Sequence, residues 1–365
     1  MSPSYQQVTV LGMALDPIHV GTGGARLGRV DLTIVRDPVT RVPKIPGSSL
    51  AGVCRSYAAM AQEEQRQNSG PSGTRSKPYY PDCAGQGQPD KAGKGGHCGQ
   101  ADCPICTVFG FARGAGGGFA GLAAFSDAHL LLFPVATREG PVWITCPDAL
   151  RRIDQEISGV LDNAVYQKNG GPQPLNLGWL LLERKNTLPD GNDWPALNKN
   201  IHKCIAERVA IVSDELFTHV VNSNLEVRTS VSIDPETGAA EEKKLFSYEA
   251  LPRATVLVWD VVCKNPNHFQ VGGQKVSAKI NNQDIADPAK VFEVVKTAHP
   301  YLECLGIGGM GTRGMGRLRV IHDAPQTSDA SKAAAPNSSP PDSATGDASA
   351  SSEAVQAPQG SRGGE

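Results

Sequence analysis

The sequence predicts an α+β fold in which helices pack on one face of a largely antiparallel sheet. Runs of apolar and β-branched residues are interspersed with segments of helical periodicity, and the two kinds do not alternate as they do in parallel βαβ proteins. A chain of 365 residues, 39% of them hydrophobic, is also long enough to bury a substantial core. It contains no run of about 18 apolar residues and begins without the pattern of a signal peptide, so we expect no membrane partner and a cytoplasmic location.

The expected elements follow from local patterns. Strand-like runs occupy residues 8–15, 30–36, 122–133, 142–145, 255–262 and 317–321. After Ser48, a residue type that caps helices, apolar residues recur at helical spacing until an Asn-Ser-Gly sequence at residues 68–70 ends the pattern. Two further helices are expected at about residues 213–222 and 288–298, and Pro300 ends the second.

Residues 323–365 form a segment of biased composition. Of these 43 residues, 28 are Ala, Ser, Pro or Gly and none is aromatic, so the segment cannot bury enough apolar surface to fold and is expected to be disordered. Six acidic and two basic residues give it a net charge of −4, whereas the whole chain carries −2. Residues 1–322 therefore carry +2, which is compatible with a nucleic-acid partner.

Four cysteines lie close together in a Gly-rich stretch. Cys83, Cys98, Cys103 and Cys106 span 24 residues, and His97 precedes Cys98. Thiolates and imidazole at such spacing are ligands of tetrahedral zinc, and the Cys-x-x-Cys pair at 103 and 106 is a common knuckle. We therefore expect a structural zinc site, with His97 as a substitute ligand. Free cysteines and a redox pair are the alternatives.

Residues 306–317 are rich in glycine and arginine. Their glycines satisfy G-x-G-x-x-G, but no helix and second strand follow as a dinucleotide site requires. We expect instead a loop whose backbone amides approach a phosphate chain and whose arginines add positive charge. A tight turn between a helix and a strand is the alternative. The residues expected to bind are Gly308, Gly309, Gly311, Arg313 and Arg317.

The segment from residue 19 to residue 55 carries the sharpest signal. A Gly-rich loop that begins at His19 leads into a strand-like run with Asp31, and Pro46 then introduces a helix whose first amides could bind an anion. A single carboxylate can position a metal-bound water or assist deprotonation of a ribose 2′-hydroxyl, although the same spacing fits an Asp31 in a surface ion pair. The residues expected to contact a phosphate backbone are Arg26, Arg36, Lys44, Gly47, Ser48, Ser49 and Arg55.

Residues 19–55, 109–152 and 306–320 resemble, in this order, segments of CRISPR RAMP proteins, the repeated backbone subunits of type III effector complexes. The stretches LFPV and VWITCP resemble the Cmr (type III-B) subunit more than its Csm (type III-A) counterpart, whereas a metal knuckle is more typical of the Csm type. The resemblance implies a ferredoxin-like (RRM-like) core over residues 1–322, with insertions at about residues 62–106, the zinc knuckle, and 225–252, a thumb β-hairpin.

The resemblance also implies a function in antiviral defence. Such subunits polymerise head to tail along a CRISPR RNA guide, with other type III effector subunits, and the catalytic members cut complementary target RNA at regular intervals with a divalent metal such as Mg²⁺ or Mn²⁺. Carried over by residue, the resemblance places the catalytic carboxylate at Asp31, a histidine of the same loop at His19, and an acidic residue at the base of the thumb at Glu226. We therefore expect an endoribonuclease. A non-catalytic structural RNA-binding subunit and a zinc-stabilised protein unrelated to RNA are the alternatives.

Overall fold

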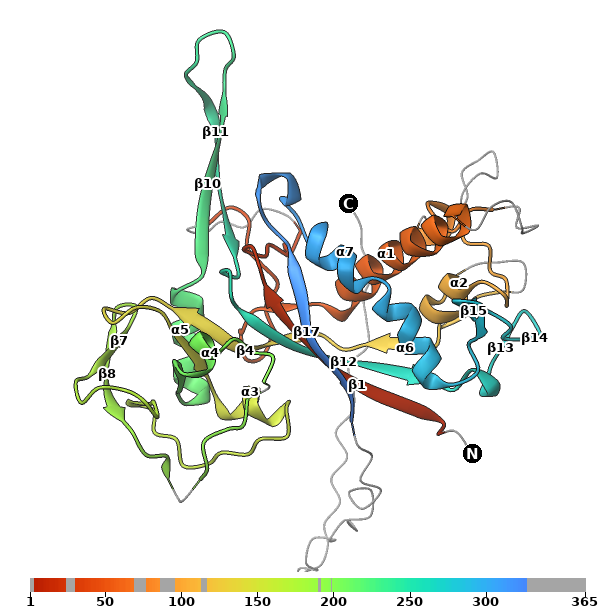
Figure 1. Cartoon of the computed structure of the whole chain (residues 1–365). Helices are drawn as coiled ribbons and strands as arrows, with labels where there is room; N and C mark the ends of the chain where they lie inside the picture. Colours follow the sequence, from red (N-terminus) through yellow and green to blue (C-terminus); the bar gives the residue numbers. More distant parts are fainter. Residues whose placement is uncertain are drawn as a thin grey trace, which may run out of the picture. The chain divides into compact units, whose positions relative to one another are not determined.

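The computed structural model describes residues 3–23, 30–68, 77–85, 96–112, 117–189, 192–197 and 199–326. These residues form one large mixed sheet of 11 strands, three two-stranded sheets, and helices that pack on the large sheet (Figure 1). The mixture of helices and sheet expected from the sequence is confirmed. Within the described ranges, no helix is both long enough and apolar enough to cross a membrane.

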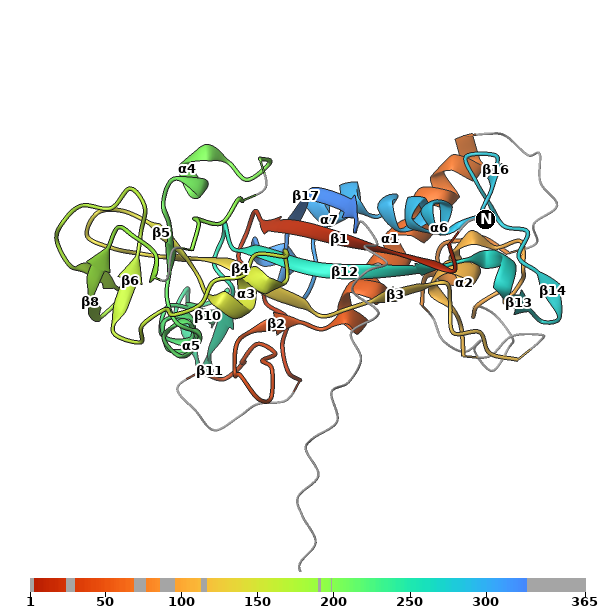
Figure 2. The same ribbon diagram turned by 90° about the horizontal axis from the view of Figure 1, so that it is seen from below.

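The centre of the large sheet consists of antiparallel neighbours. β1 (Tyr5–Ala14) lies between β17 (Leu318–Pro325) and β12 (Val256–Lys264), and β12 pairs in turn with β4 (Ala128–Val135). Three helices lie on one side of these strands: α1 (Gly47–Asn68), α6 (Pro288–Lys296) and α7 (His299–Cys304) (Figure 2). Both α6 and α7 contact α1, and their buried side chains share one hydrophobic core with those of β1.

The sheet continues beyond β4 into a second lobe. β5 (Val142–Thr145) pairs with β4, and the order then runs through β9 (Val209–Ile211), β6 (Ala164–Tyr166), β8 (Leu180–Lys185) and β7 (Leu175–Leu177). The pairs β5–β9 and β6–β8 are parallel, which the expectation of a largely antiparallel sheet did not include. Connections that return the chain to the same end of the sheet make these parallel pairs possible.

The other elements of the described residues are short. The helices α3 (Pro147–Arg151), α4 (Lys203–Ala206) and α5 (Asp214–Ser223) belong to the second lobe. β2 (Lys44–Ile45) pairs with β4, and β3 (Ala123–Phe125) pairs with β12. The rest are α2 (Pro104–Phe109), the 3-10 helices η1 (Asp82–Ala84), η3 (Pro266–His268) and η4 (Gly311–Arg313), and two small hairpins, β13 (Gln270–Val271) with β14 (Gln274–Lys275) and β15 (Lys279–Ile280) with β16 (Gln283–Asp284).

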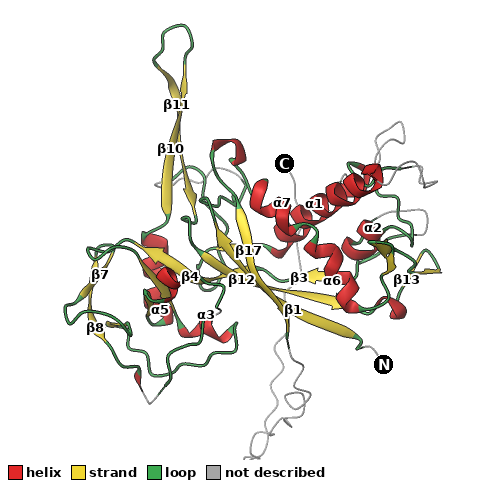
Figure 3. Cartoon of the chain, viewed as in Figure 1, coloured by secondary structure: helices red, strands yellow, loops and turns green. Residues whose placement is uncertain are grey.

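A long hairpin projects away from the large sheet (Figures 1 and 3). Its strands are β10 (Glu226–Ile233) and β11 (Ala240–Ala250), which pair with each other as a separate two-stranded sheet. At the tip, the Asp234 carboxylate accepts a hydrogen bond from the Glu236 backbone, and Gly238 adopts a left-handed φ of +66°. The hairpin lies within the residues for which the resemblance implied a thumb.

The structure corrects the expected strand at residues 30–36. Leu32, Ile34 and Arg36 form isolated bridges with Tyr248, Gly21 and Pro43. Because these three partners belong to different segments, the run has no continuous neighbour along which a ladder could form. The segment is therefore an extended connection that contacts the loop after His19, at Gly21, and the hairpin, at Tyr248.

Three expected boundaries also change. The run 122–133 is divided between β3 and β4. Pro300 does not end the expected helix, because α6 ends at Lys296 and α7 then begins with Pro300 in its first turn, where a missing N–H is tolerated. β17 continues to Pro325, so the expected start of the tail at residue 323 falls inside a strand. Residues 327–365 lie outside the described residues.

Candidate functional site

Asp31 lies beside β11, near the base of the projecting hairpin. The Ser247 backbone N donates to its Oδ2 at 2.7 Å, and the Ser247 hydroxyl donates to the same oxygen at 2.9 Å. In return, the Asp31 backbone N donates to Ser247 Oγ at 3.2 Å. These hydrogen bonds, above all the one from the Ser247 backbone, lower the pKa of Asp31. Because the side chain is exposed, the structure presents a fixed, negatively charged carboxylate to solvent.

His19 is held by the same strand two residues further along. Its Nδ1 lies 2.6 Å from the Glu249 carbonyl oxygen and so carries the donated proton, and its ring meets the Tyr248 ring edge-on at 5.9 Å. Only 6% of His19 is exposed. The structure thus attaches His19 and Asp31 to neighbouring positions of β11. The burial of the histidine suits it to holding the loop in place.

The two faces of the hairpin differ in character. Glu226 lies on the face opposite Ser247, because side chains alternate along a strand and Ser247 pairs with Thr229. Its carboxylate accepts a hydrogen bond from Arg228 Nε at 2.6 Å, and no contact joins it to Asp31 among the described residues. The structure therefore does not bring Glu226 together with Asp31.

The face that carries Ser247 is apolar further along the hairpin. Val231 and Leu245 are paired across the two strands, and 42% and 66% of their surfaces are exposed. Val227 and Ile233 are exposed on the same side of β10. Sequence reasoning missed Ser247 and these apolar residues, although the period-two alternation of Val, Thr, Val and Ile at residues 227–233 is a signal that could have found the exposed face.

The Gly-rich loop at residues 306–317 packs against His19 and the hairpin. The Gly309 backbone N donates to the His19 carbonyl at 2.8 Å. At Gly308, φ is +88° and an added Cβ would lie 2.3 Å from the same carbonyl oxygen, so only glycine fits. Arg313 lies over the Phe246 ring, 5.4 Å from its centroid. Arg317 forms two hydrogen bonds with the Asp16 carboxylate.

Several residues expected to bind phosphate have partners within the chain. Lys44 Nζ lies 2.7 Å from Asp127 Oδ2. The Asp127 carboxylate also accepts a hydrogen bond from the Gly47 backbone N–H, a donor that an anion bound at the start of the helix would need. Arg36 pairs with the Glu249 carboxylate at 2.9 Å and donates to Asn222. At the start of α1, Ser48 is exposed and Ser49 is half-buried, and the Ser49 backbone N donates to the Pro46 carbonyl at 2.9 Å. Arg26 lies outside the described residues.

The four cysteines come together as one cluster. The sulfur atoms of Cys83, Cys98, Cys103 and Cys106 all lie within 4.8 Å of one another, with separations of 3.6 Å for Cys98–Cys106 and 3.9 Å for Cys83–Cys103. A tetrahedral zinc with Zn–S bonds of about 2.3 Å requires sulfur atoms about 3.8 Å apart. The donor set and its spacing therefore fit a structural zinc ion.

His97 and Arg55 depart from their expected roles. His97 is not part of the sulfur cluster, since its Nδ1 accepts a hydrogen bond from Arg55 Nη2 at 2.8 Å. Burial, followed by the neighbouring Arg55, lowers the pKa of His97. Arg55 is only 8% exposed, so it cannot contact a phosphate chain on the surface as expected. Its long side chain passes into the space beside the cysteines.

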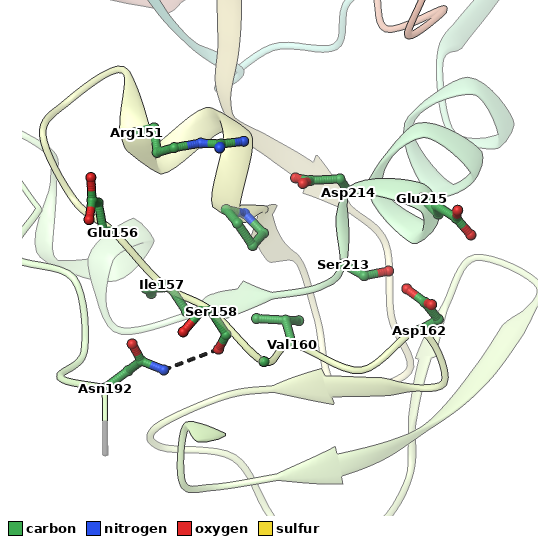
Figure 4. A pocket seen from close by; sticks show the side chains of 12 residues that line it. Arg151, Glu156, Ile157, Ser158, Val160, Asp162, Asn192, Ser213, Asp214 and Glu215 are labelled. Atoms are coloured by element: carbon green, nitrogen blue, oxygen red, sulfur yellow. Dashed lines mark hydrogen bonds between the residues drawn. The ribbon is translucent and has the colours of Figure 1, made fainter. Parts of the chain in front are cut away.

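A pocket in the second lobe contains none of the expected site residues. Its wall includes Glu156, Asp162, Asp214 and Glu215, with Arg151 as a basic neighbour (Figure 4). Asn192 donates to the Ser158 carbonyl at the rim. A lining with this excess of carboxylates repels a phosphate backbone, so we assign the pocket no part in binding RNA.

Solved structures of other proteins have a fold similar to that of this chain. A Cmr-beta type III-B complex bound to cognate target RNA contains a chain that matches 87% of this chain and 99% of its own length, with a TM-score of 0.53 and 16% identity. Oligomeric Cmr4 from Pyrococcus furiosus matches 89% of this chain and 100% of its own, with a TM-score of 0.51 and 19% identity. At these identities the likeness concerns the fold.

The sequence comparison extends over a similar length. The Cmr endoribonuclease Cmr4 of Pyrococcus furiosus is 25% identical over 327 residues, which cover 84% of this chain and 92% of the relative. The sequence pattern of the RAMP superfamily matches residues 13–319. The chain therefore belongs to the RAMP superfamily, and within it the chain resembles Cmr4.

Proposed function

We propose that this chain is a repeated backbone subunit of a type III-B CRISPR ribonucleoprotein that binds the guide and cuts complementary target RNA at regular intervals. One observation carries the proposal: an exposed, charged carboxylate, Asp31, is fixed at the base of a projecting hairpin whose adjoining face is apolar. The similarity to a Cmr endoribonuclease and to a Cmr chain in a complex with target RNA supports it. Other type III subunits and further copies of the chain complete the particle.

The hairpin and Asp31 have complementary tasks in cleavage. Apolar side chains such as Val231 and Leu245 can insert between stacked bases, at a cost of about a few kcal/mol per unstacked step. An unstacked nucleotide has the freedom to align its ribose 2′-oxygen with the adjacent phosphorus for in-line attack. The O2′–P bond then forms as the P–O5′ bond breaks, and the 2′-hydroxyl proton passes through solvent to the leaving 5′-oxygen, so that the products are a 2′,3′-cyclic phosphate and a 5′-hydroxyl. Asp31 contacts Ser247 on the same face of the hairpin as these apolar side chains. Its carboxylate would therefore lie near the phosphate backbone of the unstacked RNA.

The lowered pKa of Asp31 makes its carboxylate a weak base but a good ligand for a cation. Its Oδ2 is held by Ser247, and no described residue donates to Oδ1, which leaves that oxygen for the reaction. A divalent cation such as Mg²⁺ or Mn²⁺ would supply stabilisation of the charge that develops on the phosphate. In this proposal His19 positions the loop through Glu249, and Glu226, which accepts a hydrogen bond from Arg228 on the other face of the hairpin, is assigned no direct part in the reaction.

The guide would run along the surface formed by the start of α1 and the Gly-rich loop. Ser48, Gly311 and Arg313 are exposed and Ser49 is half-buried, which supports this path. Phosphate and 2′-hydroxyl contacts of this kind do not read sequence, so one subunit can bind any guide.

We propose a ferredoxin-like core with two insertions. Two observations support this core. In the sheet, the four antiparallel strands lie in the order β17–β1–β12–β4. Along the chain, α1 follows β1 and precedes β4, and α6 and α7 follow β12 and precede β17. The insertions are the segment of about residues 62–106, where zinc bound by Cys83, Cys98, Cys103 and Cys106 would order the chain, and the thumb at 225–252. We place the tail after β17, at residues 327–365, and the protein in the cytoplasm.

The test uses the assembled complex and an end-labelled complementary RNA. Asp31→Asn should abolish cleavage, while guide binding and assembly remain, because the substitution keeps the shape of the side chain and removes its charge. Asp162→Asn, an exposed change in the second lobe, is the matched control. A ladder of regular steps from the wild type supports the proposal. Undiminished cutting by Asp31→Asn would refute the assignment of Asp31 as the catalytic carboxylate and favour a structural RNA-binding subunit.

A further inference from the structure

Arg55 is a buried arginine on α1 that faces the four-cysteine cluster. Its Nε donates to the Cys83 carbonyl at 2.7 Å, its Nη1 to the Gly110 carbonyl at 2.6 Å, and its Nη2 to His97 Nδ1 at 2.8 Å. All three guanidinium nitrogens therefore have an acceptor inside the protein. Neither the fold of the sheet nor the proposed cleavage of RNA uses these contacts.

The three acceptors belong to the three segments that supply the thiols. Cys83 is itself one of the four cysteines, and His97 directly precedes Cys98. Gly110 is the C-cap of α2, the short helix that begins after Cys103 and contains Cys106. A single planar guanidinium thus holds every segment that carries a sulfur ligand. The three donors of a lysine ammonium all radiate from one nitrogen, whereas the guanidinium presents its donors on three separate nitrogens in one rigid plane.

The charge of Arg55 complements a metal-bound cluster. Arg55 is only 8% exposed. Among the described residues, no ion pair joins the guanidinium to a carboxylate, and an isolated buried charge is costly. A zinc ion with four thiolates carries a net charge of −2, so a buried cation beside it reduces an unfavourable excess of negative charge.

We propose that Arg55 is the positioning residue of the zinc site: it gathers the three ligand segments against α1 and compensates part of the tetrathiolate charge. The inference rests on the zinc site proposed above. Groups of this kind around a metal orient the ligands, and their removal typically lowers metal affinity about 10–100-fold. A second contact, from Ser56 Oγ to the Ala84 carbonyl at 2.8 Å, fastens the Cys83 segment to the same helix.

The experiment measures metal affinity in the full-length chain. Protein stripped of metal under reducing conditions is titrated with Co²⁺, whose thiolate charge-transfer absorption reports a four-sulfur site, in competition with a chelator of known affinity. The variants are Arg55→Gln and Arg55→Lys, and Arg151→Gln on the surface of α3 is the matched control. We expect an affinity about 10–100-fold lower for Arg55→Gln, a smaller loss for Arg55→Lys, and none for Arg151→Gln.

A merely structural arginine would give a different result. Arg55→Gln would then lower the melting temperature of the metal-free and the metal-loaded protein equally, and its Co²⁺ affinity would equal that of the wild type, which overturns the inference. If Arg55→Gln does not fold, a wild-type affinity in Arg55→Lys overturns it equally. A wild-type chain that binds no Co²⁺ refutes the zinc site together with this inference. Cleavage of target RNA is assayed separately and tests the proposed function by itself.

Discussion

Replacing Gly308 by alanine should destabilise the protein strongly. The backbone at Gly308 has a φ of +88°, and an added Cβ would lie 2.3 Å from the His19 carbonyl oxygen. A left-handed conformation costs a residue with a side chain about 1–2 kcal/mol. Relief of the overlap also breaks the hydrogen bond from the Gly309 backbone to the same carbonyl, which contributes about 0.5–1.5 kcal/mol. Together these give a loss of about 1.5–3.5 kcal/mol.

Gly311→Ala in the same loop is the matched control. No atom lies within 4 Å of a Cβ at this position, so its effect should stay within about 1 kcal/mol. Urea unfolding followed by circular dichroism measures both variants. With an m-value of about 3 kcal/mol/M, the midpoint of Gly308→Ala should fall by about 1 M. Equal midpoints for the two variants would refute the argument that contact with His19 dictates glycine at 308.

Two further predictions concern the metal cluster and a largely buried histidine, whose side chain is 12% exposed. Cys103→Ser should reduce the bound zinc from about one equivalent per chain to none and should lower the melting temperature. Cys204→Ser, at an exposed cysteine, should change neither quantity. Elemental analysis measures the zinc and calorimetry the melting temperature, and a full equivalent of zinc in Cys103→Ser would contradict the site. Burial lowers the pKa of His299 to about 4, although Asp323 opposes the shift. Because the unfolded state takes up this proton at higher pH, stability should fall as the pH drops from about 6.5 to 4, by on the order of 3 kcal/mol. The free energy of unfolding, measured at pH 7 and at pH 4.5, should differ less between the two pH values in His299→Leu than in the wild type. An unchanged difference would exclude His299 as the cause.

The sequence predicted those elements whose signal is local. The apolar run at 142–145 is a strand with the same bounds, and the helix expected at about residues 213–222 is α5, with Ser213 as its N-cap. The helix after Pro46 ends at Asn68, where the apolar spacing stops. In each case the pattern that identifies the element lies within a few residues, so no distant part of the chain is needed to interpret it.

The candidate site was predicted less completely, because its chemistry depends on distant partners. Asp31 was singled out, but Ser247, which fixes it, lies 216 positions away. Arg55 and Lys44 were grouped with the phosphate-binding residues because both are basic. The structure buries the first beside the cysteines and pairs the second with Asp127. A basic side chain does not reveal, from its sequence neighbours, whether its counter-charge is internal.

The sequence by itself determined the class of fold, the cysteine motif, and the resemblance that leads to Asp31. Only the tertiary structure decided that all four cysteines, without His97, form one cluster, and that Glu226 faces away from Asp31. The physical reason is the range of the interactions. Periodicity and turn chemistry act between near neighbours, whereas burial, ion pairing and the choice of ligands arise when segments separated by tens or hundreds of residues pack together.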